Sequence, residues 1–189
     1  DQLIRAYEAD RVAHALLIHG PTGIGKGSLA RGYAQRLLCT VPGPMACGQC
    51  PSCVLFQSES HPDYQWIAPE AEGKPIKIDT VRKLVQDLNL TRQYAAYRVL
   101  IINQAEQLNT NAVNALLKSL EEPSEGTVWI LVSDRPSRLP ATVLSRCQKV
   151  TVRAPGRSEA ESWLQVEAPG SNAGALLSAA SGSPLRALT

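Results

Sequence analysis

Short apolar runs alternate along this chain with segments whose apolar residues recur at helical spacing. The strand-like runs, rich in Leu, Ile and Val, lie at residues 15–19, 64–68, 98–102, 127–132 and 148–152. Helical spacing covers residues 28–38, 112–120 and 139–146, and a segment that starts at Asp79 and carries Val81, Leu84, Val85 and Leu88. Strands that are apolar without interruption are buried on both faces. The alternation therefore predicts an α/β fold with a parallel sheet and helices on both faces.

The pattern changes near residue 155. Beyond it, residues 158–166 and 172–180 have helical spacing, and Gly182-Ser-Pro predicts the start of another helix. We therefore expect an α/β domain over residues 1–155 and a small helical domain over residues 156–189. The chain begins at Asp1 and stops within a helical pattern, which suggests a piece trimmed from a longer protein.

A glycine-rich loop lies between the first strand and the first of these helices. Residues 20–27 read GPTGIGKG and fit the phosphate-loop pattern G-x-x-x-x-G-K, except that Gly27 stands where Ser or Thr should follow Lys26. The backbone at Gly20, Gly23, Gly25 and Gly27 is expected to curl around phosphate, and Lys26 to reach the outer phosphates. The hydroxyl that normally holds Mg²⁺ is missing, so the loop predicts a degenerate nucleotide site that could take ATP or ADP.

The strand at residues 98–102 ends in a second departure from an ATPase. Asn103 and Gln104 stand where a D-E-x-[DEH] pattern would place two carboxylates, and Glu106 lies one helical turn further on. Amides keep the shape of these acids but lose the negative charge that holds Mg²⁺ and orients water. We therefore predict weak or absent ATP hydrolysis at this site. The alternative is an active ATPase in which Glu106 or Ser28 serves as an unusual metal ligand.

Four of the five cysteines fall within one short loop. Cys39, Cys47, Cys50 and Cys53 have the spacing C-x7-C-x2-C-x2-C, with glycines and prolines between them that predict tight turns. Four thiolates at this spacing suit a tetrahedral Zn²⁺ site, and a full set of protein ligands predicts a structural metal. Disulfides or a redox pair are the alternatives, which a cytosolic chain and the count of four disfavour. Cys147 stands apart and is expected to be a packed core thiol.

Composition and charge narrow the functional classes. The net charge is only +2 over 189 residues, and no block of like charge marks a nucleic-acid arm. A zinc-dependent DNA-binding module is therefore disfavoured, the more so because residues 39–53 contain no Lys or Arg. No apolar run approaches 18 residues, so we expect a cytoplasmic protein without membrane contact.

Taken together, several motifs carry a resemblance. The glycine loop with residues 98–106, the stretch NALLKSLEEP at 114–123, Ser145-Arg146-Cys147, and His61-Pro-Asp-Tyr64 after the cysteines resemble the bacterial clamp-loader branch of AAA+ proteins. The amides at the strand end point to its delta-prime members, which are components of the DNA polymerase III holoenzyme, a DNA-directed DNA polymerase and nucleotidyltransferase complex. No independent ATPase is then expected.

The resemblance implies a domain plan and a set of partners. An AAA+ domain with a zinc module at residues 39–53 would be followed by a helical lid and, beyond this chain, by a collar domain. The partners would be the clamp-loader ATPase subunits and the delta subunit. Through that assembly the protein would act on the sliding clamp and on primer-template DNA, in ATP-driven loading of the clamp during replication.

The resemblance also implies roles for single residues. Arg146 would project as an arginine finger into the ATP site of a neighbouring subunit; the alternative is an ordinary ion pair with a surface carboxylate. Ser133 and Arg186 fall near the positions of two nucleotide-sensing residues. His61 is expected to be a turn or cap residue, since four thiolates complete the metal. The helix at 112–120, with Thr110 or Asn111 as its cap, is expected to pack an apolar face on the sheet.

Overall fold

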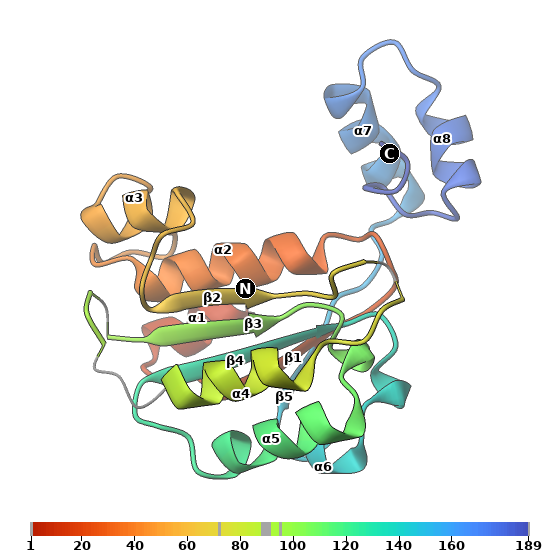
Figure 1. Cartoon of the computed structure of the whole chain (residues 1–189). Coiled ribbons are helices and arrows are strands. Elements are labelled where there is room, and N and C mark those ends of the chain that lie inside the picture. The colour runs from red at the N-terminus through yellow and green to blue at the C-terminus, as the bar shows by residue number, and fades with distance from the viewer. Residues whose placement is uncertain (1, 72, 88–91, 95, 189) are drawn as a thin grey trace.

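The computed structural model describes residues 2–71, 73–87, 92–94 and 96–188. Its centre is a five-stranded parallel sheet in the order β2-β3-β4-β1-β5 (Figure 1). The strands are β1 (Ala15–His19), β2 (Tyr64–Ile67), β3 (Arg98–Ile102), β4 (Thr127–Ser133) and β5 (Gln148–Thr151). Each coincides with a segment predicted to be a strand, and the predicted α/β fold with a parallel sheet is confirmed.

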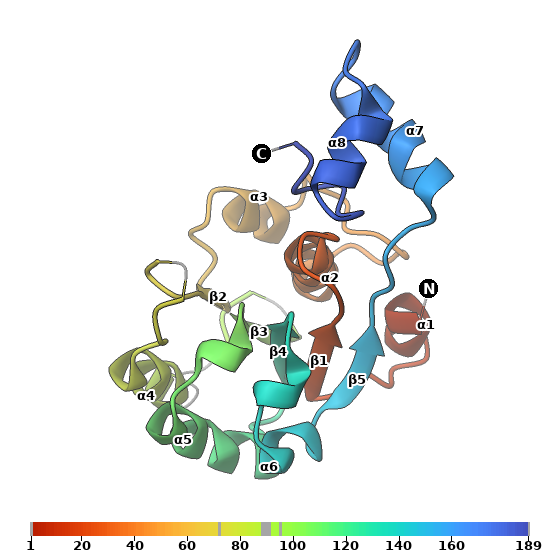
Figure 2. The ribbon, with the colours of Figure 1, turned by 90° about the vertical axis from the view of Figure 1, so that its right-hand side faces the viewer.

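Helices cover both faces of this sheet (Figure 2). One face packs against α1 (Gln2–Glu8) and α2 (Lys26–Leu38), the other against α4 (Ile78–Asp87), α5 (Thr110–Glu121) and α6 (Ala141–Leu144). Successive strand residues point to opposite faces. In β1, Leu16 and Ile18 pack toward α2, whereas Ala15 and Leu17 pack toward α5. Two covered faces explain why the inner strands β1, β3 and β4 are buried almost throughout, whereas the edge strands β2 and β5 also carry exposed residues.

Several element boundaries differ from the sequence predictions. The cap of α5 is Asn109, whose side chain accepts a hydrogen bond from Ala112 N at 2.8 Å, and not Thr110 or Asn111. Helix α2 begins at Lys26, directly after the left-handed Gly25. Helix α6 spans only Ala141–Leu144, within the predicted 139–146. Helices α1 and α3 (Pro51–Gln57) were not predicted, and Leu88 lies outside the described residues.

The last part of the chain forms a helical pair beside the sheet domain. Helices α7 (Arg157–Glu167) and α8 (Ala173–Ala179) bury a small apolar cluster of their own, made by Ala160, Leu164, Ala173 and Leu177. Figure 1 shows the pair standing apart from the sheet, at the end of α2 opposite to α3. The helix predicted to start at Gly182 is wrong, since the backbone there forms turns.

A buried polar hub joins the edge of the sheet to the neighbouring loops. Asp63 is 1% exposed, and its Oδ2 accepts hydrogen bonds from Gln93 N at 2.9 Å and Tyr94 N at 3.0 Å. Its Oδ1 lies 3.4 Å from Nη2 of Arg98, which is also buried and donates to the carbonyl of Asp87. This hub fixes the start of β2 against the start of β3. In the described ranges, none of the helices is both long and apolar enough to cross a membrane.

Candidate functional site: a degenerate phosphate loop, a cysteine cluster and an exposed arginine

The glycine loop lies between β1 and α2, as the motif requires. Gly23 and Gly25 have φ angles of +74° and +88°, in the left-handed region that favours glycine. The loop borders a hollow of about 290 Å³ at the carboxyl ends of the strands. Its lining combines the loop with the ends of β3 and β4 and with one residue from the C-terminal segment: Thr22, Gly23, Gly25, Lys26, Gly27, Ser28, Asn103, Gln104, Val132, Asp134 and Leu185.

Lys26 does not project freely into this hollow. Its side chain is only 3% exposed, and its Nζ lies 2.6 Å from Oδ1 of Asp134, which directly follows β4. The same ammonium donates to the carbonyl of Pro21 at the start of the loop. The lysine expected to meet phosphate is therefore neutralised by a carboxylate of its own chain.

Gly27 faces the end of β3. A Cβ built at Gly27 would lie 3.4 Å from the ring of Trp66 and 3.9 Å from Oδ1 of Asn103. Asn103 and Gln104, the amides at the end of β3, both line the hollow. Glu106 is outside the lining, and its Oε1 accepts a hydrogen bond from Asp134 N at 3.2 Å. Ser133 is fully buried and accepts a hydrogen bond from Arg135 N.

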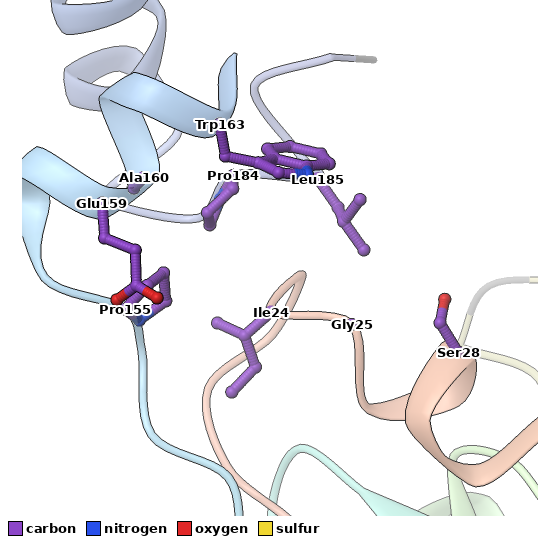
Figure 3. Close-up of a pocket in the computed structure, with 9 residues that line it drawn as sticks. All are labelled: Ile24, Gly25, Ser28, Pro155, Glu159, Ala160, Trp163, Pro184 and Leu185. Atoms are coloured by element: carbon purple, nitrogen blue, oxygen red, sulfur yellow. The ribbon is translucent and has the colours of Figure 1, made fainter. Parts of the chain in front are cut away.

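A second hollow, of about 410 Å³, lies between the loop and the helical pair (Figure 3). Ile24, Pro155, Trp163, Pro184 and Leu185 give it largely apolar walls, and the carboxylate of Glu159 reaches its edge. Apolar walls of this kind suit a flat aromatic group.

The C-terminal segment rests directly on the glycine loop. Leu185 N donates to the carbonyl of Gly23 at 3.2 Å. A Cβ at Gly23 would come within 2.0 Å of Ser183 Oγ and 2.6 Å of Arg186 Cγ, so only glycine fits beneath this segment. Leu185, like Gly25 and Ser28, lines both hollows. Arg186 thus lies beside the loop, and the part of its side chain nearest to Gly23 is the aliphatic stem.

Arg146 lies just beyond α6, on the helical layer formed by α4, α5 and α6. Its side chain is 33% exposed, and its Nη2 lies 2.5 Å from Oε1 of Glu121 at the end of α5. Its Nη1 donates to the carbonyl of Thr142 at 2.8 Å. The following residue, Cys147, is buried in the core, and burial raises the pKa of its thiol to about 11. The prediction of a packed core thiol is confirmed, and this buried neighbour anchors the exposed arginine.

The four predicted cysteines converge at the other end of α2. Their Sγ atoms all lie within 4.8 Å of one another, and Cys39 Sγ lies 3.6 Å from Cys47 Sγ and 3.9 Å from Cys50 Sγ. Four thiolates around one zinc ion at about 2.3 Å stand about 3.8 Å apart, so the spacing fits. Backbone N–H groups of Cys47, Cys50 and Cys53 donate to cluster sulfurs. Hydrogen bonds of this kind lower the pKa of Cys39 and Cys50 against the effect of burial, whereas burial raises the pKa of Cys53 to about 12. These cysteines could hold a metal ion.

Two buried side chains brace the cluster. Arg36, on α2, donates to the carbonyls of Val41 at 2.9 Å and Met45 at 3.2 Å, and so fixes the loop before Cys47. His61 accepts from Asp63 N through Nδ1 and bonds Ser52 Oγ through Nε2. Burial lowers its pKa, consistent with a neutral ring. His61 is thus a turn residue, as predicted, and its bond to Ser52 also braces α3.

Comparison with known proteins decides the family. A family model described as DNA polymerase III, delta subunit, matches residues 1–155. The DNA polymerase III subunit delta' of Pseudomonas aeruginosa is 46% identical over 179 residues, which cover 93% of this chain and 55% of that protein. The chain belongs to the delta-prime family of DNA polymerase III subunits.

Other relatives agree with this assignment. The subunit delta' of Escherichia coli is 38% identical over 168 residues, which cover 88% of this chain and 50% of that protein. This delta-prime chain therefore spans about half the length of the curated relatives it matches.

Solved structures show the fold. A gamma subunit-related protein of DNA polymerase III from Thermotoga maritima has a TM-score of 0.58 at 21% identity, covering 88% of this chain and 50% of its own. The Thermotoga maritima RuvB Holliday junction branch migration motor has a TM-score of 0.62 at 16% identity, covering 98% and 55%. The AAA+ fold expected from the sequence is thereby confirmed.

Three residues of the delta-prime site escaped the sequence reasoning: Asp134, Trp66 and Leu185. Asp134 offered a signal, because it follows β4, the sheet neighbour of the strand that leads into the glycine loop. Trp66 and Leu185 come from distant segments, and nothing in the sequence places them against the loop.

Proposed function

We propose that this protein acts in the bacterial clamp loader of the DNA polymerase III holoenzyme, in ATP-driven loading of the sliding clamp on primed DNA. Its contribution is Arg146, lent in trans to the ATP site of a neighbouring ATPase subunit. The observation that carries the proposal is the position of Arg146: a guanidinium at the outer surface of the α4–α6 layer, anchored by the buried Cys147. Membership of the delta-prime family supports it.

The geometry around Arg146 suits a finger that is supplied to another subunit. Its ion pair with Glu121 lies at the surface, where both side chains are partly exposed (33% and 48%). Surface ion pairs contribute about 0–1 kcal/mol, so a stronger anion can displace this carboxylate at little cost. A phosphoryl group in transfer is such an anion, because negative charge spreads over its oxygens.

The chain's own site is proposed to lack turnover. Gly27 brings no hydroxyl, and Asn103 and Gln104 bring no charge to the place where Mg²⁺ would be held. Catalysis of phosphoryl transfer depends on charge stabilisation and positioning, so these losses act together. In the alternative of an active ATPase, Glu106 or Ser28 would hold the metal. Glu106 gains no support, since its carboxylate accepts from the backbone of Asp134 outside the hollow, whereas Ser28 does line the hollow.

The remaining parts take supporting roles in this proposal. The four cysteines hold a structural Zn²⁺, which shapes residues 39–53 as an inserted module. Residues 1–155 form the AAA+ domain and residues 156–189 belong to a lid, with a collar domain expected in the longer relatives. The ATPase subunits and the delta subunit are the proposed direct partners in the cytoplasm, and the clamp and primer-template DNA are met through the assembly.

The test is reconstitution of the clamp loader with Arg146→Ala. We expect its DNA-stimulated ATPase and clamp loading to fall by about a hundredfold or more, since arginine fingers contribute about 10³–10⁵ in related systems. Arg31→Ala is the matched control, because Arg31 also pairs with a surface glutamate, at 2.9 Å, but on α2 across the sheet. Full ATPase with Arg146→Ala would exclude the finger. Brisk ATP hydrolysis by the purified chain alone would instead favour the active-ATPase alternative.

A further inference from the structure

Asp134 forms an ion pair with the lysine of the glycine loop. Its Oδ1 lies 2.6 Å from Nζ of Lys26, and the lysine is almost completely buried. The Lys26 ammonium also donates to the carbonyl of Pro21 within the loop. Two donors of this ammonium are thus directed to groups of its own chain, and its positive charge is balanced by a carboxylate.

A second carboxylate stands behind the first. Glu106 Oε1 accepts a hydrogen bond from Asp134 N at 3.2 Å, and this bond holds the backbone that carries Asp134. Glu106 Oε2 is buried and has no hydrogen-bond partner among the described residues. Lys26 therefore faces Asp134, and Glu106 lies behind Asp134. These two carboxylates and one ammonium together do not favour the binding of a further anion such as phosphate.

The glycine loop is also engaged from outside. The segment 183–186 lies against Gly23, whose carbonyl accepts from Leu185 N. Leu185 closes one wall of the 290 Å³ hollow. A polyphosphate entering this hollow would meet Asp134 at the place where Lys26 should receive it.

We propose that Asp134 acts as an internal anion that holds Lys26 and keeps nucleotide polyphosphates off this loop. Asp134 is thus the residue that decides whether the site takes a nucleotide. This role of Asp134 rests on the degenerate site of the proposed function, but it does not depend on Arg146. The ATPase of an assembly reconstituted with Arg146→Ala and nucleotide binding by the purified chain are separate measurements, so one proposal can fail without the other.

The experiment is titration calorimetry of the purified chain with ATP or ADP in the presence of Mg²⁺. The wild type is expected to show no saturable binding at millimolar nucleotide. Asp134→Asn keeps the shape but removes the charge, and is expected to bind with a Kd at least about tenfold below the millimolar limit at which the wild type shows no saturation. Asp79→Asn is the control, since Asp79 is an exposed acid on α4 outside the hollow, and it should behave as the wild type.

Two results would overturn the inference: saturable micromolar binding by the wild type, or a folded Asp134→Asn variant that gains no affinity. If Asp134→Asn does not fold, lysine acylation of the wild-type protein provides a second test. Acylation of lysines followed by mass spectrometry should find Lys26 protected, and millimolar ATP with Mg²⁺ should leave that protection unchanged. A change in the protection of Lys26 caused by ATP would contradict the proposal.

Discussion

The buried pair of Asp63 and Arg98 allows a quantitative prediction about stability. In Asp63→Asn, three donors still face the side chain: the N–H groups of Gln93 and Tyr94 and the guanidinium of Arg98. The amide offers one oxygen in place of two, and its NH₂ group must point at a donor. Arg98, only 6% exposed, also loses the carboxylate that faces it, while its hydrogen bond to the carbonyl of Asp87 remains.

The magnitude follows from burial. Breaking a buried ion pair by removing one partner costs about 3–5 kcal/mol, because the remaining charge is left in a poorly solvated place. At this chain length 1 kcal/mol shifts the melting temperature by about 2–4 °C, so Asp63→Asn should lower it by about 10 °C. Urea unfolding followed by circular dichroism gives the free energy of unfolding directly.

Asp79→Asn is the control for this measurement. Asp79 is 87% exposed and lies 3.6 Å from Arg82, so its replacement should change stability by no more than about 0.5 kcal/mol. If Asp63→Asn also costs less than about 1 kcal/mol, the reasoning from the buried hub is wrong.

Three further predictions concern the cysteines, the finger and pH. The purified chain should carry one Zn²⁺ by atomic emission, which Cys50→Ser loses and Cys147→Ser keeps; retention by both variants would contradict the proposed site. Glu121→Gln should change stability by less than about 1 kcal/mol and leave the ATPase of the reconstituted assembly intact; a loss as large as that of Arg146→Ala would mean that the ion pair itself is required. Because burial lowers the pKa of His61, the unfolded chain takes up its proton first, and stability should fall as pH drops below about 6.5. Urea unfolding of metal-loaded protein should show a shallower fall with His61→Gln, and an identical pH profile would refute this account.

The inner strands of the sheet could be predicted from the sequence because burial on both faces leaves β1, β3 and β4 apolar at nearly every position. Helix α3 could not be predicted, since Pro51 and Cys53 follow other prolines, glycines and cysteines that read as turns, although Pro51 is well suited to the first turn of a helix. The cap of α5 was misplaced because Asn109, Thr110 and Asn111 all have side chains that can cap, and only the backbone of the folded chain selects among them.

The candidate site divides in the same way. The cysteine cluster and the amides at the end of β3 are local in sequence, so spacing placed them correctly. The ion pair of Lys26 with Asp134 joins residues more than one hundred positions apart, and the contact of Leu185 with Gly23 more than one hundred and fifty. Such contacts depend on the order of strands in the sheet and on the course of the final segment, which no local pattern encodes.

Helix α2 carries the glycine loop at its first residue and Cys39 at its C-cap. At about 1.5 Å per residue, its 13 residues form a rod of about 20 Å. Both ends of this rod are clamped, by the Lys26 ion pair at one and by Arg36 and the cysteine loop at the other. The cysteine module and the glycine loop should therefore move together as one rigid body. A displacement of the module would then also displace the loop at the far end of the helix.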